Sequence, residues 1–393
     1  MTSPHSVRRR SAALPAPARP GDDTGPDGAE QWQAEVRRDD GALDELAEEW
    51  DGLAARCASA TPFQSAAWQA SWWRAYGRPG RLRVVLVRRG GLLVAAAALV
   101  RGRTGVLTGL GGALIDFTDV LLDDEHAAEA AARLAAALPV RRPWQALELR
   151  EVRPGSAAHQ LYALWPGRRH QLLDSLCQSL PAIPMEQIYE RLPGRTAQRR
   201  RAKQRKLEAA GVRAERVEPA AVGAAVAELL RLHALQWEGR GVTPEHTSER
   251  FRAHLTESTA GLARRGQAVL YRYQLDGEPV AVDLMLLGRR FAGLYLYGAH
   301  PRLRERLDVA GLLFATGLAE AVAAGVPEIN LLRGEEPYKE RWRPNREHNH
   351  RLLFGPRRGA VLLSLRLAAV RSRVALARRL RGPVRRLRER LAR

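Results

Sequence analysis

The sequence is poor in cysteine and in lysine. The scarcity of cysteine excludes disulfide-rich folds and cysteine-based metal sites, and the scarcity of lysine makes each lysine stand out. Cys57 and Cys177 are the only cysteines in 393 residues, and neither lies near a second cysteine or a histidine at metal-ligand spacing. The sequence therefore predicts no disulfide framework, no metal site and two buried, inert thiols. Lysine occurs only at positions 203, 206 and 339, so arginine supplies 60 of the 63 basic residues. A lysine in this chain is thus a candidate for a role that arginine cannot fill.

Long apolar runs are missing too. No uncharged stretch reaches the roughly 18 residues that a membrane-spanning helix needs. Residues 1–30 mix Ser, Pro, Asp, Gly and Arg, lack the apolar core of a secretory signal, and are interpreted as a disordered leader. These observations predict a cytoplasmic protein. The remaining chain can build a core, because its 9 Trp, 8 Tyr and 6 Phe exclude disorder for most of its length.

The formal charge of +20 is concentrated in two segments. Residues 195–206 carry seven basic residues and no acidic one, and residues 356–393 carry 13 arginines against one glutamate. The first segment predicts a helix with charge on all faces, for which contact with an anionic acceptor and plain solvation remain equally open. The second predicts a basic helical tail that is dispensable for folding and binds an anionic membrane surface, placing the protein peripherally at the inner membrane face.

Between leader and tail, apolar periodicity predicts two α/β domains, at 31–170 and 171–355. The first has predicted helices at 41–58, 65–76 and 125–138 and strands at 82–87, 92–100 and 146–152. The second has predicted helices at 196–210, 219–237, 248–265 and 308–324 and strands at 212–217, 268–275, 280–287, 291–297 and 328–332. Tight turns join three of these strands, at 268–297, and predict an antiparallel meander.

The element order of the second domain resembles that of the GNAT acyltransferases. The run Ile329-Asn330-Leu331-Leu332-Arg333-Gly334-Glu335-Glu336-Pro337-Tyr338-Lys339, with Trp342 beyond it, resembles the strand-end signature of the CelD-like (cellulose biosynthesis) acetyltransferases, relatives of the Fem peptidyltransferases. Weaker matches lie at 61–65, 116–119, 276–281 and 298–313. The resemblance implies a tandem GNAT-like α/β fold, with mixed sheets flanked by helices and the acyl donor in the second, better-formed half. The chain has Asn330 where the family usually has Asp, and Asp308 at a helix start that is usually Ser-Pro-Gly.

The strand-end run also supplies candidate catalytic groups. Amide formation from a thioester needs a base for the amine proton, donors for the developing oxyanion and an acid for the leaving thiolate. Glu336 is the candidate base or amine anchor, Tyr338 the candidate acid and Lys339 a candidate oxyanion contact. Asp283, a carboxylate inside an apolar strand, is a second carboxylate candidate. The alternative for the run is an exposed ion pair under a packed lid.

A helix that starts at Asp308 could bind the pyrophosphate of coenzyme A, because a helix N-terminus offers free N–H groups and partial positive charge. The candidate donor contacts are Tyr297, Arg304, Arg306, Ala310 and Gly311. The alternative is that the arginines form a solvated face and Asp308 is a plain N-cap.

The predicted function is that of an acyl-CoA-dependent N-acyltransferase, with acetyl-CoA or another acyl-CoA as co-substrate and no metal. It would acylate an amine of a small metabolite or saccharide by direct attack in a ternary complex. One alternative is a Fem-like transferase that takes an aminoacyl group from tRNA, bound with steep salt dependence by the basic segments. The other is a non-catalytic GNAT scaffold held on membrane or nucleic acid by its tail.

Overall fold

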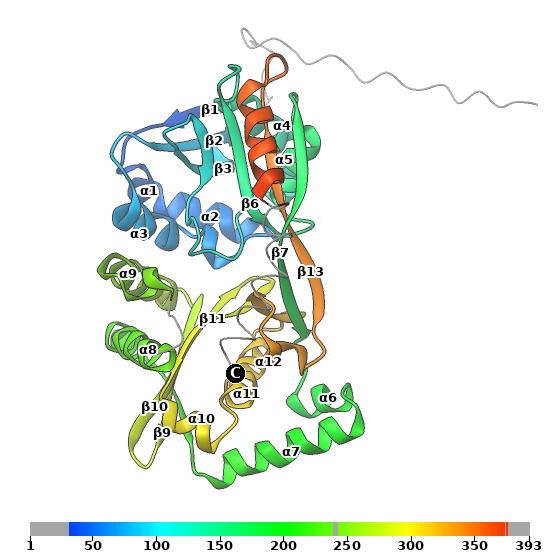
Figure 1. Ribbon diagram of the computed structural model, residues 1–393. Coiled ribbons are helices and arrows are strands. Elements are labelled where there is room, and N and C mark those ends of the chain that lie inside the picture. The colour runs from blue at the N-terminus through cyan, green and yellow to red at the C-terminus, as the bar shows by residue number, and fades with distance from the viewer. Residues whose placement is uncertain (1–30, 239–242, 374, 376–393) are drawn as a thin grey trace, which may run out of the picture.

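The computed structural model describes residues 31–238, 243–373 and 375, and it builds them into two halves that share one large mixed sheet (Figure 1). Helices cover both faces of the sheet in each half. The predicted α/β fold of mixed sheet flanked by helices is confirmed.

The first half is built on a meander of strands, with three α-helices between its first two strands and two more further along the chain. Its elements are β1 (Trp32–Arg37), α1 (Ala42–Glu45), α2 (Ala47–Arg56), α3 (Ala66–Tyr76), β2 (Leu82–Arg89), β3 (Leu92–Arg101), β4 (Val106–Gly109), β5 (Leu121–Leu122), α4 (Ala127–Ala137), β6 (Ala146–Val152) and α5 (Ala157–Leu164). Ser65 caps α3, since its Oγ accepts the N–H of Trp68 at 3.2 Å. The helix predicted at 41–58 is two helices, because Leu46 departs from helical backbone angles.

The second half follows the predicted order more closely. Its elements are β7 (Arg169–Pro181), α6 (Met185–Glu190), α7 (Gly194–Ala209), β8 (Arg213–Arg216), α8 (Val222–Trp237), α9 (Glu249–Arg264), β9 (Ala268–Leu275), β10 (Glu278–Gly288), β11 (Phe291–Ala299), α10 (Pro301–Arg306), α11 (Val309–Ala323), β12 (Glu328–Arg333), α12 (Pro337–Glu340) and β13 (Asn345–Phe354). The antiparallel meander of β9, β10 and β11 is confirmed. Helices α8 and α9 lie on one face of it and α11 on the other (Figure 1).

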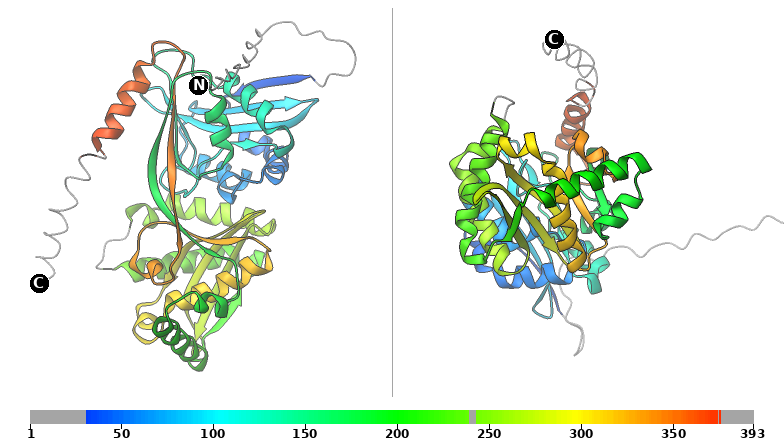
Figure 2. Two further views of the ribbon diagram at one scale, coloured as in Figure 1. Left: turned by 90° about the vertical axis from the view of Figure 1, so that its right-hand side faces the viewer. Right: turned by 90° about the horizontal axis from the view of Figure 1, so that it is seen from below.

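Two long strands, β7 and β13, join the halves into a single sheet. They pair with each other in antiparallel fashion from Asn345↔Ser179 to Phe354↔Arg169. At one end β13 also pairs with β6 of the first half, and at the other end β7 pairs with β12 of the second. The strand order is β1-β2-β3-β4-β6-β13-β7-β12-β11-β10-β9-β8, with β5 beside β3. The long pair runs the length of the molecule in the left view of Figure 2.

The core is continuous across the halves as well. Phe63 and Trp68 of the first half contact Tyr295 of β11, with ring centroids 5.7 and 5.3 Å apart. Phe117 packs edge to face on Phe291, at 5.8 Å. Such pairs stabilise by about 0.5–1.5 kcal/mol each beyond the area that they bury. This aromatic cluster therefore fixes the two halves against each other. The predicted burial of both thiols, Cys57 and Cys177, is confirmed.

The chain after β13 contains a helix at residues 361–373 that packs on β7 and β13 and reaches β6 of the first half. Leu363 and Leu367 are buried against Leu353 and Leu172. Arg366 Nε lies 2.5 Å from Oε2 of the fully buried Glu148. We expected the chain from Arg357 onward to be dispensable for folding. For the helix at 361–373 this expectation is wrong, because its leucines are part of the core. Residues 376–393 of the predicted tail, and the predicted leader at 1–30, lie outside the described residues. Within the described part, none of the helices has the length and apolarity needed to span a bilayer.

Candidate active site

A cleft opens where β11 and β12 separate. The two strands are parallel and pair only at Ala292↔Ile329 and Gly293↔Asn330. Beyond that point Tyr295 is an extra residue in β11, a bulge that bends the strand. The resulting cavity has a volume of about 180 Å³, and it is lined by α8 from one face of the sheet and by α11 from the other. The cleft thus passes between the strands, and a ligand could contact it from either face of the sheet.

The backbone of β12 is shaped to leave the sheet at this cleft. Leu332 has a positive φ of 61°, which a leucine rarely adopts. Its N–H is bound at 2.7 Å by Oδ1 of Asn330, and this side-chain hydrogen bond holds the bend. Asn330 thus has a clear structural task.

All four predicted catalytic residues line the cleft, namely Asp283, Glu336, Tyr338 and Lys339. Of the predicted donor contacts, Tyr297 and Ala310 line it, whereas Gly311 does not. The backbone of Arg304 and Arg306 lies in α10, but their side chains are outside the described part of the structure. The structure therefore brings most of the predicted site residues to one cleft, and which of them act in a reaction remains a prediction.

Asp283 is a buried carboxyl group in the wall of the cleft. It sits on β10 opposite Tyr271 of β9 and Tyr297 of β11, so all three side chains share the face that α11 covers. Among the described residues, Oδ1 of Asp283 has no hydrogen-bond partner. Burial raises the pKa of Asp283 to about 7, against hydrogen bonds from Tyr271 and Tyr273 that act in the opposite direction. A carboxyl group with this pKa can take up and release a proton near neutral pH.

The turn after β12 carries the other three groups. Lys339 is 3% exposed, and its Nζ donates to the carbonyl of Arg333 at 2.9 Å and lies 2.8 Å from Oε2 of Glu336. The Glu336 side chain is 48% exposed, at the mouth of the cleft. Burial raises the pKa of Tyr338, so its phenol is protonated at neutral pH and can donate a proton or hydrogen bond. The alternative expectation for this run was an exposed ion pair. In the Glu336–Lys339 pair only the glutamate is exposed, and the lysine is buried.

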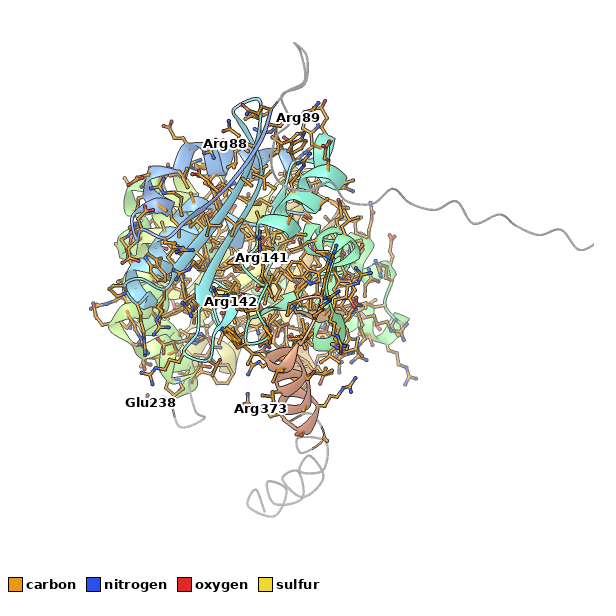
Figure 3. The ribbon with its side chains drawn as sticks, turned by 90° about the horizontal axis from the view of Figure 1, so that it is seen from above. Arg88, Arg89, Arg141, Arg142, Glu238 and Arg373 are labelled. Atoms are coloured by element: carbon orange, nitrogen blue, oxygen red, sulfur yellow. The ribbon has the colours of Figure 1, made fainter. Side chains whose placement is uncertain are left out.

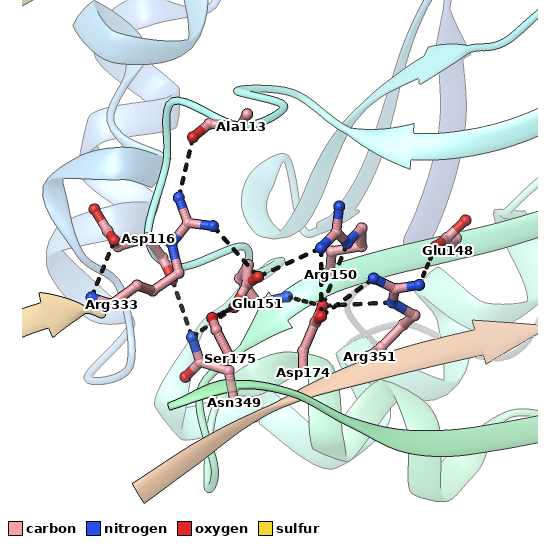
Figure 4. Close-up of polar contacts among 10 residues, drawn as sticks. All are labelled: Ala113, Asp116, Glu148, Arg150, Glu151, Asp174, Ser175, Arg333, Asn349 and Arg351. Atoms are coloured by element: carbon pink, nitrogen blue, oxygen red, sulfur yellow. Dashed lines mark hydrogen bonds and ion pairs between the residues drawn. The ribbon is translucent and has the colours of Figure 1, made fainter. Parts of the chain in front are cut away.

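The first half contributes directly to the cleft through Asp116, which lies in its wall beside Arg333. Arg333 reaches across the halves: its Nε donates to Oδ1 of Asp116 at 2.9 Å and its Nη1 to Glu151 at 3.3 Å (Figure 4). Asn349 of β13 donates to the same Glu151 at 3.1 Å. These charge-assisted bonds join β12, β13 and the first half next to the reactive groups.

The wall also contains residues that were not among the predicted site residues, including Asp116, Arg333, His233 and Trp237. Asp116 and Arg333 belong to segments that carry the family resemblance, and that signal could have found them. His233 and Trp237 come from the end of α8, where nothing in the sequence marks them. The Nδ1 of His233 lies 2.8 Å from the carbonyl of Tyr297, so it must be the protonated nitrogen that donates to β11.

The start of α11 carries a carboxylate that two cations neutralise. Asp308 precedes the first residue of α11, and its Oδ2 lies 2.7 Å from Nη1 of Arg200 and 3.2 Å from Nζ of Lys203. Both cations come from α7. Arg200 is buried and stacks over Trp342, 4.7 Å from the ring centroid. The basic helix is thus not merely solvated, because one of its arginines is part of the core. No cluster of potential metal ligands occurs in the described ranges.

Comparison with known proteins agrees with this geometry. Residues 194–340 match the family model described as an acetyltransferase (GNAT) domain. The second half contains a GNAT domain, and the protein is an acyltransferase. The match includes α7, the meander, α11 and the turn that holds Glu336 and Lys339. Among curated proteins, no match is found.

Solved structures share the fold across both halves. FemX is 12% identical, with a TM-score of 0.56 over 78% of this chain and 95% of its own. The C-terminal domain (DUF2156) of a protein named as a lysylphosphatidylglycerol synthetase from Agrobacterium fabrum is 13% identical, with a TM-score of 0.51 over 82% and 96%. L-PGS from Bacillus licheniformis is 12% identical, with a TM-score of 0.50 over 87% and 99%. At these identities the likeness shows the fold alone, and the CelD-like resemblance remains a prediction.

Proposed function

We propose that the protein is an acyl-CoA-dependent N-acyltransferase that acetylates, or otherwise acylates, an amine of a small metabolite or saccharide. The observation that carries the proposal is Asp283, a buried carboxyl group with a free Oδ1 and a pKa of about 7 in the cleft between β11 and β12. Buried carboxylates with such a pKa are costly to keep and are typical of proton-transfer sites.

In this proposal the amine and the thioester meet in the cleft and react directly. The amine nitrogen forms a bond to the acyl carbon, the carbon–sulfur bond breaks, and the amine loses one proton. Asp283 accepts that proton, directly or through one water, and Tyr338 gives a proton to the departing sulfur. Glu336 at the mouth attracts the amine in its ammonium form, which releases one proton to water before the neutral amine reacts. Lys339 holds Glu336 in place and adds positive charge near the developing oxyanion.

The cleft suits the apolar arm of an acyl thioester. Its wall includes Leu294 and Leu296 of β11, Leu313 and Phe314 of α11, and Leu331 of β12. The phosphates of coenzyme A would meet the start of α11, where Arg200 and Lys203 outnumber Asp308 and leave a net positive charge. The donor is thus held by residues of α7 as well as by the helix terminus. Tyr297 and Ala310 would contact the arm between these ends.

The test is turnover of acetyl-CoA with a panel of primary amines, followed by release of free thiol. Asp283→Asn should reduce kcat about 10²–10³-fold, since a positioned base contributes on that order. Glu335→Gln is the matched control, because Glu335 is exposed, lies in the same turn and is not in the wall of the cleft. Equal rates for the two variants would remove Asp283 from the proposal. No thermal shift with acetyl-CoA and no turnover by the wild type would favour the scaffold alternative instead.

A second candidate is transfer of an aminoacyl group from tRNA, and the exposed side of α7 favours it. Four of its basic residues are exposed at the same end of the molecule as Asp308: Arg195, Arg199, Arg205 and Lys206. Asp308 itself also opposes a phosphate at the start of α11. Charging of an amine from aminoacyl-tRNA, with binding that weakens steeply between 50 and 200 mM salt, would support this candidate. Acetyl-CoA turnover without tRNA would support the first.

A further inference from the structure

A surface of the first half combines exposed apolar side chains with arginines. Trp144, Val361 and Leu365 are 60%, 58% and 64% exposed. The start of the C-terminal helix touches the loop that carries Trp144, because the N–H of Leu362 donates to the carbonyl of Pro143 at 3.0 Å. Val361 and Leu365 are four residues apart and so lie on one face of that helix. A cluster of large exposed apolar side chains marks an interaction site more often than a free surface.

An arginine-lined groove lies next to these side chains. Its volume is about 480 Å³, and Arg141, Arg357 and Arg358 line it together with apolar residues such as Leu138 and Trp165. Among the described residues, no Asp or Glu lines this groove. Arg142 adds a guanidinium over the ring of Trp144, at 5.9 Å. Figure 3 shows Arg141, Arg142 and Arg373 on the face that is seen from above, with Arg373 on the C-terminal helix at the edge of that face.

The chain that follows this helix continues the same charge. Residues 376–393 contain eight arginines and one glutamate. In the sequence they follow directly on the described helix. Any partner of this surface must therefore accept many guanidinium groups as well as aliphatic and indole side chains.

We propose that this surface docks the protein onto an anionic lipid bilayer. Trp144, Val361 and Leu365 enter the headgroup region, where an indole ring and aliphatic side chains on one helix face are favoured. The arginines of the groove bind lipid phosphates. A nucleic acid would satisfy the arginines but would leave Val361 and Leu365 in water. The bilayer is therefore the partner that matches both parts of the surface.

This surface lies at the opposite end of the molecule from α7, and the cleft belongs to the second half (Figure 1). Docking through it leaves the cleft open to a donor and an acceptor. The inference goes beyond the proposed function and does not depend on it, because it uses none of the residues assigned to catalysis.

The experiment is sedimentation of the full chain with vesicles of phosphatidylglycerol and phosphatidylcholine, compared with phosphatidylcholine alone. We expect binding to the anionic vesicles only, weakened by salt. Val361→Ser with Leu365→Ser, and separately Trp144→Ala, should each reduce the partition coefficient at least tenfold, since each change removes apolar side chains that the bilayer would bury. Arg141→Gln with Arg358→Gln should reduce it about fivefold per arginine. Arg195→Gln with Arg199→Gln on α7 is the charge-matched control and should leave it unchanged.

Three outcomes would overturn the inference. The first is full vesicle binding by the Val361→Ser, Leu365→Ser variant at an unchanged melting temperature, which would assign binding to charge alone. The second is loss of all binding in a chain that ends at residue 375, because the described surface should bind weakly by itself. The third is binding to unfractionated tRNA but not to anionic vesicles, which would make nucleic acid the partner. A blue shift of the tryptophan fluorescence on addition of anionic vesicles, absent in Trp144→Phe, would support insertion of Trp144 into the bilayer.

Discussion

Asp283 combines two properties that rarely occur together at a position without a function. Its carboxyl group is buried in a strand between apolar neighbours, and one of its oxygens has no hydrogen-bond partner within the described structure. An unsatisfied buried polar atom costs about 1–3 kcal/mol. A ligand with a donor group would satisfy it, and Asp283 is in the wall of a cleft that can admit one.

The pKa of Asp283 predicts how activity depends on pH. The base is competent only when ionised, so turnover should rise with pH and level off above about 7. In Asp283→Asn this rise should disappear together with most of the rate. The measurement is kcat/KM from pH 5 to 9 for both proteins. A rise of the same size in the variant would assign the titration to another group.

The same shift predicts a gain in stability for that variant. The folded-state pKa of about 7 exceeds the ordinary value of 3.8, so the folded protein holds this proton more tightly than the unfolded chain. The stability that it provides is present below pH 4 and is lost between about 4 and 7, by about 1.4 kcal/mol per pH unit. In Asp283→Asn the side chain at position 283 is an amide, which is uncharged at every pH. Urea unfolding should therefore show the variant more stable than wild type at pH 8, and little changed at pH 4.

Lys339 shows how the structure revises a prediction made from composition. Its rarity suggested a contact that arginine cannot make, and the contact found is a tight turn in which Nζ bridges Arg333 and Glu336. Lys339→Met should destabilise by about 1–3 kcal/mol, because a buried carbonyl loses its donor. Glu336→Gln, at the exposed end of the pair, should cost less than 1 kcal/mol. Equal losses of unfolding free energy in the two variants would contradict this order.

The sequence predicted segments that line the cleft but not the whole wall of the cleft. Glu336, Tyr338 and Lys339 follow a buried strand within a short run, and Asp283 stands out as a charge among apolar residues. His233 and Trp237 reach the cleft only because α8 packs closely on β11, where Gly298 leaves room: a Cβ there would lie 2.4 Å from the backbone of His233. That proximity depends on tertiary packing, which no local pattern records.

At the scale of elements, the C-terminal helix carries a second revision. The sequence analysis predicted a basic tail that is dispensable for folding. Ala360, Leu363 and Leu367 nevertheless recur at helical spacing, and together they bury one side of it against β7 and β13. Arg366 completes the contact by pairing with Glu148, whose side chain has no exposure to solvent.

Deleting residues 360–393 should consequently destabilise the protein. Loss of two buried leucines and exposure or isolation of the Glu148 carboxylate should together cost on the order of 3–5 kcal/mol. Deleting only 376–393 should leave the melting temperature nearly unchanged, which makes it the control. Calorimetry of both truncations decides the point. A melting temperature that is the same for the two would restore the expectation of a tail that contributes nothing to folding.

The predicted and missed elements differ in their chemistry. Strands with continuous apolar runs, such as β3 and β10, and capped helices such as α3 and α9, were predicted within a few residues. The strands for which no range was predicted include β7 and β13, with the sequences RHQLLDSLCQSLP and NREHNHRLLF, in which polar residues are frequent. Each lies between two neighbouring strands, so hydrogen bonding to both sides compensates for a weak apolar pattern.

At the scale of the whole molecule, the shared sheet bears on whether the two predicted domains are independent. The Phe354 end of β13 pairs with β6, and Phe291 and Tyr295 are covered by aromatic side chains of the first half. Arg333, in the wall of the cleft, is bound by Asp116 and Glu151 of that half. A second half made alone would expose these rings and leave the arginine without its partners.

A fragment of residues 171–355 should therefore fail to fold, although it contains the entire GNAT match. Exposing three or four large buried apolar side chains costs about 1.5–3 kcal/mol each, which equals most of the stability of an ordinary domain. The measurements are cooperative thermal unfolding and amide dispersion in the fragment. The full chain should instead show one transition, because a common sheet and core couple the halves. The control is a chain cut between Gly167 and Arg168, in the loop before β7. Its pieces, 1–167 and 168–393, are co-expressed, so that both halves are present and can assemble. A fragment 171–355 that unfolds cooperatively at the temperature of the full chain would show that the halves are independent domains that merely touch.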